Sequence, residues 1–243
     1  MEPQPQQTAA PPPPRWGVGD FLMGLVAGLA LSTLFASAWL AITGDKDLDL
    51  TGQALSQVGL WTGMLGSVFL ASHRKGTGSL AEDFGFKARW SDIGLGAMVA
   101  VVVQLIVLPG LGYLLRPLLG QPEVSGPVRD LMDETKGPAF IILVLSVSVG
   151  APLVEELFFR GLLLRSLQRR LPDGWAVALA AVAFGLAHGS ALPADAVILV
   201  IVSLTVFGAA LAMLALRTGR LGPGIVAHAL FNLLTILYLA ATR

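Results

Sequence analysis

The charged residues divide the chain into seven long apolar stretches. None of these stretches contains Asp, Glu, Lys or Arg, and each is 18 to 24 residues long. The stretches are 21–44, 50–72, 93–115, 137–154, 174–194, 196–216 and 221–242. A helix needs about 20 apolar residues to cross the hydrocarbon core of a bilayer. The pattern therefore predicts an all-α fold, a polytopic transmembrane helical bundle with about seven membrane-crossing helices.

Three regions are expected along the chain. Residues 1–15, MEPQPQQTAAPPPPR, are dominated by Pro and Gln and lack apolar periodicity, which is typical of a disordered tail. Residues 16–136 are expected to hold transmembrane helices 1–3 and their loops. Residues 137–243 form a second helical region, which begins with a long fourth helix. Pro152 should kink this helix, because proline removes a backbone N–H and clashes with the preceding turn.

The composition supports a membrane protein and excludes several other classes. Hydrophobic residues make up 54% of the chain and charged residues 13%, against about 25% charged in a typical soluble domain. The 16 basic and 16 acidic residues cancel, so we expect no nucleic-acid partner, and the lipid bilayer is the expected surroundings. The chain has no Cys, which excludes a disulfide scaffold, a thiol nucleophile and a Cys-ligated metal.

The basic residues of the loops predict the orientation in the membrane. With seven crossings, one side carries ten of them: Arg15, Arg74, Lys75, Lys87, Arg89, Arg165, Arg169, Arg170, Arg217 and Arg220. The other side carries five: Lys46, Arg116, Arg129, Lys136 and Arg243. Cytoplasmic loops are enriched in Lys and Arg. We therefore expect a cytoplasmic N-terminus and an external C-terminus, in the plasma membrane of a bacterium.

Three charged residues lie among apolar neighbours in the segment APLVEELFFRGLLLRSLQRR. They are Glu155, Glu156 and Arg160. A charge at the centre of a membrane helix costs about 2.5–3.5 kcal/mol on insertion scales. Glu156 and Arg160 are four residues apart, share a helix face and can form an ion pair. Glu155 lies five residues from Arg160, about 140° around the helix, and so stays available for another partner.

Two further apolar segments carry histidines at helical spacing. His188 follows Phe184 by one turn, and His228 precedes Asn232 by one turn. The third histidine, His73, stands beside Arg74 in a basic loop and is expected at the surface. A Glu with two His can activate water as a general base or hold a divalent metal. An Asn side chain can donate to an oxyanion.

These segments together resemble the signature of the CAAX prenyl protease 2 / bacteriocin-processing (Abi, CPBP) family of intramembrane proteases. That signature is EExxxR, then FxxxH, then HxxxN or HxxxD. It stands here as Glu155, Glu156 and Arg160, then Phe184 and His188, then His228 and Asn232. The order is that of the family, no motif position is missing, and the matching region runs from about 137 to 238. Each motif alone is weak, and the ordered trio on membrane helices is specific.

The resemblance implies a membrane-embedded endopeptidase acting on membrane-associated protein or peptide substrates. Residues 137–243 would be its catalytic core. Glu155 would activate water with His188 as its partner, and His228 with Asn232 would stabilise the oxyanion. Alternatively, Glu155, His188 and His228 would ligate a divalent metal such as zinc, as in a metalloprotease. Glu156, Arg160 and Phe184 would support the site.

Two other functions remain open from the sequence. A non-catalytic immunity or scaffold protein of the same fold is the first, and the intact motif set argues against it. A transporter is the second, because Glu and His inside a membrane also mark ion paths. The absence of a strong internal repeat argues against a transporter.

Overall fold

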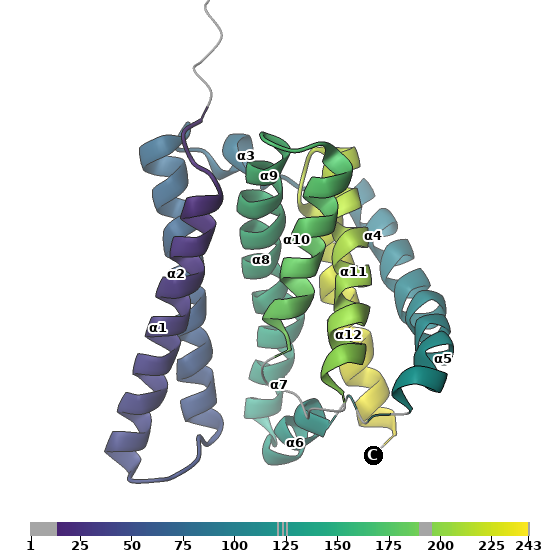
Figure 1. Ribbon diagram of the computed structural model, residues 1–243. Coiled ribbons are helices and arrows are strands. Elements are labelled where there is room, and N and C mark those ends of the chain that lie inside the picture. Colours follow the sequence, from purple (N-terminus) through teal and green to yellow (C-terminus); the bar gives the residue numbers. More distant parts are fainter. Residues whose placement is uncertain (1–13, 121, 123, 125, 190–195, 243) are drawn as a thin grey trace, which may run out of the picture.

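The computed structural model describes residues 14–120, 122, 124, 126–189 and 196–242. All regular structure in these ranges is helical, as predicted (Figure 1). Nearly all of the predicted disordered tail, residues 1–13, lies outside the described part. The elements are α1 Val18–Thr43, α2 Leu50–Lys75, α3 Leu80–Asp83, α4 Ser91–Val102, η1 Val103–Val107, α5 Leu108–Leu119, α6 Gly126–Glu134, α7 Pro138–Leu145, η2 Ser146–Gly150, α8 Ala151–Glu155, η3 Glu156–Leu164, α9 Arg165–Gln168, α10 Asp173–Ala187, α11 Val197–Thr218 and α12 Gly222–Ala241, where η marks π-helix.

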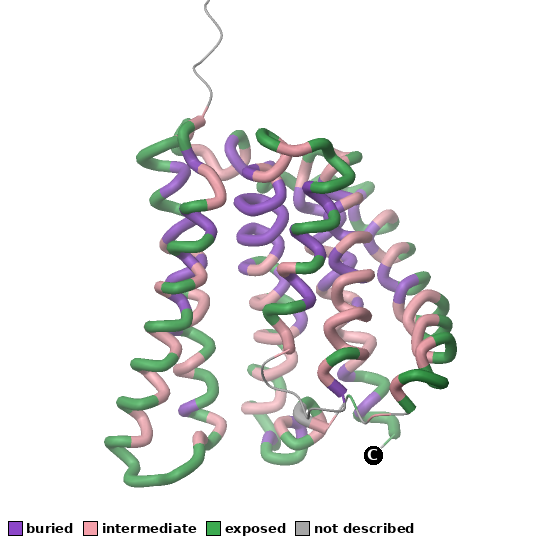
Figure 2. Tube along the Cα trace, viewed as in Figure 1, coloured by how far each residue is buried: buried purple, intermediate pink, exposed green. Residues whose placement is uncertain are grey.

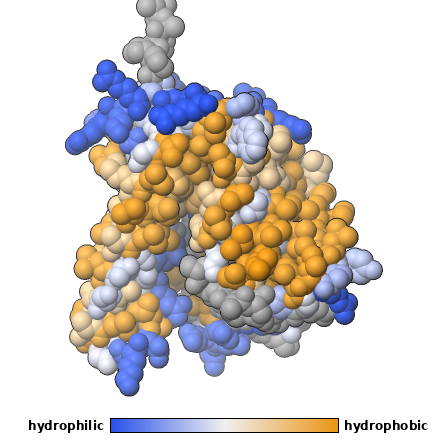
Figure 3. All heavy atoms as spheres, viewed as in Figure 1, coloured by the Kyte–Doolittle hydropathy of each residue, from blue (hydrophilic) through white to orange (hydrophobic). Residues whose placement is uncertain are grey.

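Six of the helical runs in the described residues are long and apolar enough to cross a membrane. They are Val18–Thr43, Leu50–Lys75, Ser91–Leu119, Pro138–Gln168, Val197–Thr218 and Gly222–Ala241. The protein is therefore an integral, multi-pass membrane protein. Figure 3 shows the matching surface, a broad apolar face with hydrophilic residues gathered at the two ends of the bundle.

The expectation of about seven full-length crossings needs one correction. The fifth apolar stretch, 174–194, yields only α10, which has 15 residues. At 1.5 Å per residue this helix is about 22 Å long, shorter than the hydrocarbon core of about 30 Å. The apolar stretch continues through His188 and Gly189, but the helix ends at Ala187, with His188 as its C-cap.

The predicted long fourth helix is present and is the centre of the bundle. It runs from Pro138 to Gln168 through α7, η2, α8, η3 and α9. Every residue of η3 is buried, whereas none in α7 is. Figure 2 shows the buried positions gathered in the half of the bundle that is nearer the α9–α10 turn. The polar motif of the fourth helix therefore lies in the most buried part of the helix.

The helices α1 and α2 form an N-terminal hairpin, and this hairpin packs against the fourth helix. A Cβ built on Gly63 would lie 2.1 Å from the backbone N of Gly28, so the two helices touch at their backbones. Such contacts between small residues stabilise helix pairs in lipid. Phe21 of α1 stacks on Phe158 of η3, with 4.4 Å between ring centroids. The hairpin thus packs directly on the segment that carries the charged motif.

Candidate active site

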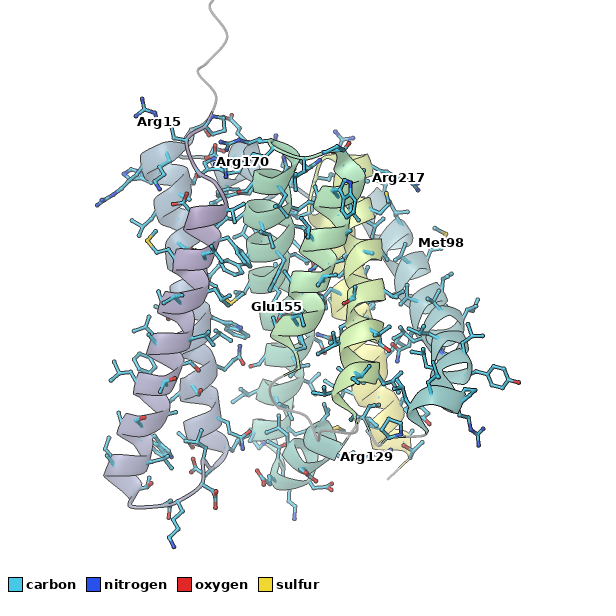
Figure 4. All side chains as sticks on the ribbon, in the orientation of Figure 1. Arg15, Met98, Arg129, Glu155, Arg170 and Arg217 are labelled. Atoms are coloured by element: carbon cyan, nitrogen blue, oxygen red, sulfur yellow. The ribbon has the colours of Figure 1, made fainter. Side chains whose placement is uncertain are left out.

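The structure brings the three motifs of the sequence together. Glu155 ends α8, and Glu156 and Arg160 lie in η3 of the same long helix. Phe184 lies in α10, and His188 caps it. His228 and Asn232 lie in α12. Figure 4 shows Glu155 midway along the bundle, between the end that carries Arg15, Arg170 and Arg217 and the opposite end near Arg129. The first of these is called the basic end below.

Glu156 and Arg160 form the predicted ion pair, and it is fully buried. Arg160 Nη1 lies 2.8 Å from Glu156 Oε1, with side chains that are 1% and 0% exposed. Arg160 also donates to the backbone carbonyl of Gly208 in α11, and its guanidinium lies 4.2 Å from the centroid of the Phe184 ring. The pair therefore connects the fourth helix with α10 and α11. Removing one partner of such a pair leaves a buried charge without its counter-charge, which costs about 3–5 kcal/mol.

Glu155 faces the two motif histidines, on a different side of the helix from the ion pair. Its Oε2 lies 3.5 Å from His188 Nε2 and 3.9 Å from His228 Nε2. Both separations exceed the usual N–H···O hydrogen-bond range of about 2.7–3.2 Å. Oε2 is buried and has no hydrogen-bond partner. The sequence prediction that Glu155 stays apart from Arg160 and faces other groups agrees with this geometry.

The other nitrogen of each imidazole ring is held by an acceptor. His188 Nδ1 lies 2.8 Å from the carbonyl oxygen of Phe184, and His228 Nδ1 lies 3.2 Å from Glu156 Oε1. A carbonyl or carboxylate oxygen only accepts, so the proton is on Nδ1 in both rings. In the neutral rings Nε2 then carries a lone pair directed at Glu155. Three acceptors therefore converge and need an electropositive partner: a shared proton, the hydrogens of a water, or a cation.

The same residues were the predicted ligands of a metal. Their chemistry suits one, because Glu and two His are a known ligand set of catalytic zinc and both rings have a second acceptor on Nδ1. Within the described ranges no group of three or more His, Cys, Asp or Glu side chains is arranged as a metal site, so metal binding stays a prediction.

Asn232 lies one turn beyond His228 and points at the fourth helix too. Its side-chain amide donates to the backbone carbonyl of Val147 in η2, with 2.8 Å between Nδ2 and the oxygen. The two residues share a face of α12, as their spacing predicted. The partner of the amide was not predicted, because Val147 is an ordinary apolar residue in the sequence.

The start of α12 lies inside the bundle, which explains how His228 reaches Glu155. A Cβ built on Gly161 would lie 3.6 Å from Leu221 Cδ1, so α12 begins beside a residue about two turns before the end of α9. A Cβ built on Gly224 would lie 2.8 Å from Glu156 Oε2. His228, only six residues after Gly222, is thereby level with Glu155 and Glu156.

An ion pair fixes this entry point of α12. Arg220 Nη2 lies 2.5 Å from Asp92 Oδ1, and Arg220 Nε also donates to the same carboxylate. The hydrogen bonds that Arg220 donates to the Asp92 carboxylate raise the pKa of Arg220. The backbone N–H of Gly222 donates to the carbonyl of Lys87. These contacts join the α11–α12 turn to the start of α4.

Aromatic rings enclose the imidazoles. Phe184 lies 4.6 Å from the ring of His188 and 5.7 Å from that of His228, between centroids. Phe207 of α11 packs edge-on against His228 at 5.5 Å. The sequence motifs missed Phe207, because nothing in its apolar neighbourhood distinguishes it from other core residues. His73, expected at the surface, is exposed.

The comparisons with known proteins agree with the motifs. Residues 137–234 match the family model described as "Type II CAAX prenyl endopeptidase Rce1-like". No curated protein and no solved structure matches the chain. The matched segment contains all seven motif residues and supports a membrane endopeptidase at the level of the family. The resemblance carried by the three motifs is thus confirmed, and over residues 137–234 this chain is similar to the Rce1-like type II CAAX prenyl endopeptidases.

Proposed function

We propose that the protein is an intramembrane endopeptidase in which Glu155 activates a water molecule. The observation that carries the proposal is the unpartnered, buried Oε2 of Glu155, which faces His188 and His228. A carboxylate next to a hydrolysable bond can take a proton from water, and such general-base catalysis contributes about 100- to 10,000-fold. The side chain of His188 is 32% exposed and that of Glu155 15%, so the site is reached from the side of His188.

Each residue then has a defined part in hydrolysis. Glu155 removes a proton from the water while the water oxygen attacks the carbonyl carbon of the peptide. A C–O bond forms, and the carbonyl oxygen becomes an oxyanion. Glu155 next passes the proton to the peptide nitrogen, the C–N bond breaks and the amine leaves. His188 accepts a hydrogen bond from the water through Nε2 and so orients it.

His228 is suited to stabilise the oxyanion. An N–H at Nε2, which faces the site beside Glu155, would donate to the oxyanion, while Glu156 Oε1 holds the ring through Nδ1. Glu156 in turn is held by Arg160. A preorganised donor of this kind is worth about 100- to 1,000-fold in rate.

The substrates are proposed to be membrane-associated proteins or peptides. The site lies within the part of the chain that crosses the bilayer, so a substrate must enter from the lipid or lie along its surface. The basic end is proposed to face the cytoplasm of a bacterium, because it carries ten of the basic loop residues. The described N-terminal end and the C-terminus lie at opposite ends of the bundle (Figure 1).

Comparison of membrane proteomes tests this function. Cells that express the wild type are compared with cells that express Glu155→Gln, and new protein termini are identified by mass spectrometry. We expect a set of termini that require Glu155. Glu82→Gln is the matched control, because Glu82 is exposed in α3. Identical termini with all three proteins would favour a non-catalytic scaffold or a transporter.

A further inference from the structure

One backbone carbonyl of the fourth helix lacks a donor in its own helix. In the π-helical turn η2 the N–H of Ala151 donates to the carbonyl of Ser146, five residues earlier. In that register the next N–H, at residue 152, would donate to the carbonyl of Val147. Residue 152 is proline and has no N–H. The bonding pattern of the helix therefore breaks at Val147.

Asn232 supplies the missing donor from another helix. Its Nδ2 lies 2.8 Å from the Val147 oxygen. The bond is partly buried, and a carbonyl left without a donor in such a place costs up to about 1–3 kcal/mol, so the bond has a clear structural purpose. Pro152 and Asn232 thus form a complementary pair, in which one residue removes a helix hydrogen bond and the other replaces it.

The bond lies one helical turn from His228 and about two turns from Glu155. Pro152 and Glu155 belong to the same short helix, α8, and Asn232 and His228 are one turn apart in α12. A hydrogen bond between Val147 and Asn232 therefore fixes the α12 helix along the helix that carries Glu155. The distance between Glu155 and His228 depends on how these two helices are aligned.

We infer that Asn232 is a positioning residue: it aligns His228 with Glu155 by donating to the carbonyl that Pro152 leaves without a helix donor. This bond uses one of the two N–H groups of the Asn232 amide. As far as it concerns activity, the inference rests on the proposed hydrolytic function. The hydrogen bond itself does not depend on that function.

A double-mutant cycle on the full-length protein separates the two roles. Asn232→Ala should lower the midpoint of thermal unfolding and reduce kcat about tenfold or more, since a shift of 1 Å in a catalytic group costs about 100-fold. Pro152→Ala restores a backbone N–H to the fourth helix. In the double variant the carbonyl of Val147 regains a donor in either helical register, so both the midpoint and kcat should recover most of the loss.

Thr235→Ala is the specificity control. Thr235 also joins α12 to another helix, through Gln104 Nε2 at 3.3 Å, but its hydroxyl donates to the carbonyl of Phe231 and not to that of Val147. Pro152→Ala should not restore any thermal stability or kcat that Thr235→Ala loses. If Asn232→Ala alone does not fold, a folded double variant supports the inference, and a double variant that fails where Pro152→Ala alone folds overturns it.

The opposite result has a distinct signature. If Asn232 serves the oxyanion, Asn232→Ala should lower kcat about 100- to 1,000-fold with unchanged thermal stability, and Pro152→Ala should rescue nothing. That outcome overturns the inference. If the wild type shows no peptidase activity, the proposed function fails, while the thermal midpoints of the four proteins still decide whether Asn232 and Pro152 are coupled.

Discussion

Glu155 Oε2 lies 3.5 Å from His188 Nε2, and no hydrogen bond joins the two atoms. The opposite nitrogen of that ring donates to the backbone carbonyl of Phe184. The carboxylate and the imidazole therefore present two acceptors to the same small space. A water that donates to both is held next to its base, which is the arrangement that hydrolysis of a peptide bond requires.

The two adjacent glutamates should differ in what their substitution does. Glu156→Gln should sharply reduce folded yield and thermal stability, because Arg160 is 1% exposed and loses its counter-charge. The expected loss is about 3–5 kcal/mol. Glu155→Gln should keep the yield of the wild type. Size-exclusion profiles and thermal unfolding in detergent measure both. Equal losses in the two variants would contradict the assignment of Glu156 as the structural member.

The close contact at Gly224 offers a test of the position of Glu156. Gly224→Ala places a Cβ about 2.8 Å from Glu156 Oε2 and should destabilise the protein by about 1–3 kcal/mol, as overpacking does. Gly94→Ala is the matched control, because a Cβ at Gly94 meets nothing within 4 Å. Thermal unfolding of both variants checks the prediction. An unchanged midpoint for Gly224→Ala would show that Glu156 and α12 are farther apart.

Peptidase activity should survive removal of divalent metal. The proposed base, Glu155, activates water without a metal, and in the described part of the chain no group of three side chains is arranged to hold one. Activity is measured after exhaustive chelation, and the metal content of the same sample by elemental analysis. About one zinc per chain, with activity lost on chelation and restored by zinc, would instead make Glu155, His188 and His228 ligands.

The orientation in the membrane can be measured with single cysteines, because the chain has none of its own. Asp173→Cys, at the basic end, should resist membrane-impermeant thiol reagents in intact cells and react after permeabilisation. Asp47→Cys, between α1 and α2, should react in intact cells. The reverse labelling pattern would place the basic end outside, and the substrates would then have to be sought on that side.

Much of the site could be predicted from the sequence, because its residues are costly in lipid. Charged and histidine side chains are conspicuous in apolar segments, and the four-residue spacing alone predicts the ion pair between Arg160 and Glu156. The contacts of Asn232 and Phe207 could not be predicted in this way. Their partners are a backbone carbonyl and an apolar ring on other helices, and only the packing of the bundle determines which of these they meet.

The lengths of the helices and their positions along the bundle could not be predicted from the sequence pattern either. Absence of charge marks a stretch as apolar but does not show where its helix ends, so α10 is shorter than the stretch that contains it. The position of His228 depends on α12 beginning beside Gly161, well inside the basic end. Contacts between distant segments, such as that of Arg220 with Asp92, set this depth.

The most direct test of Glu155 as the catalytic base is the rate of peptide cleavage by purified Glu155→Gln in lipid nanodiscs. The substrate is a membrane protein identified by its Glu155-dependent terminus, and cleavage is followed by mass spectrometry. We predict that the variant is as stable as the wild type, with unchanged KM and with kcat reduced about 100- to 10,000-fold. A folded Glu155→Gln that cleaves the same bond at the rate of the wild type would contradict this prediction.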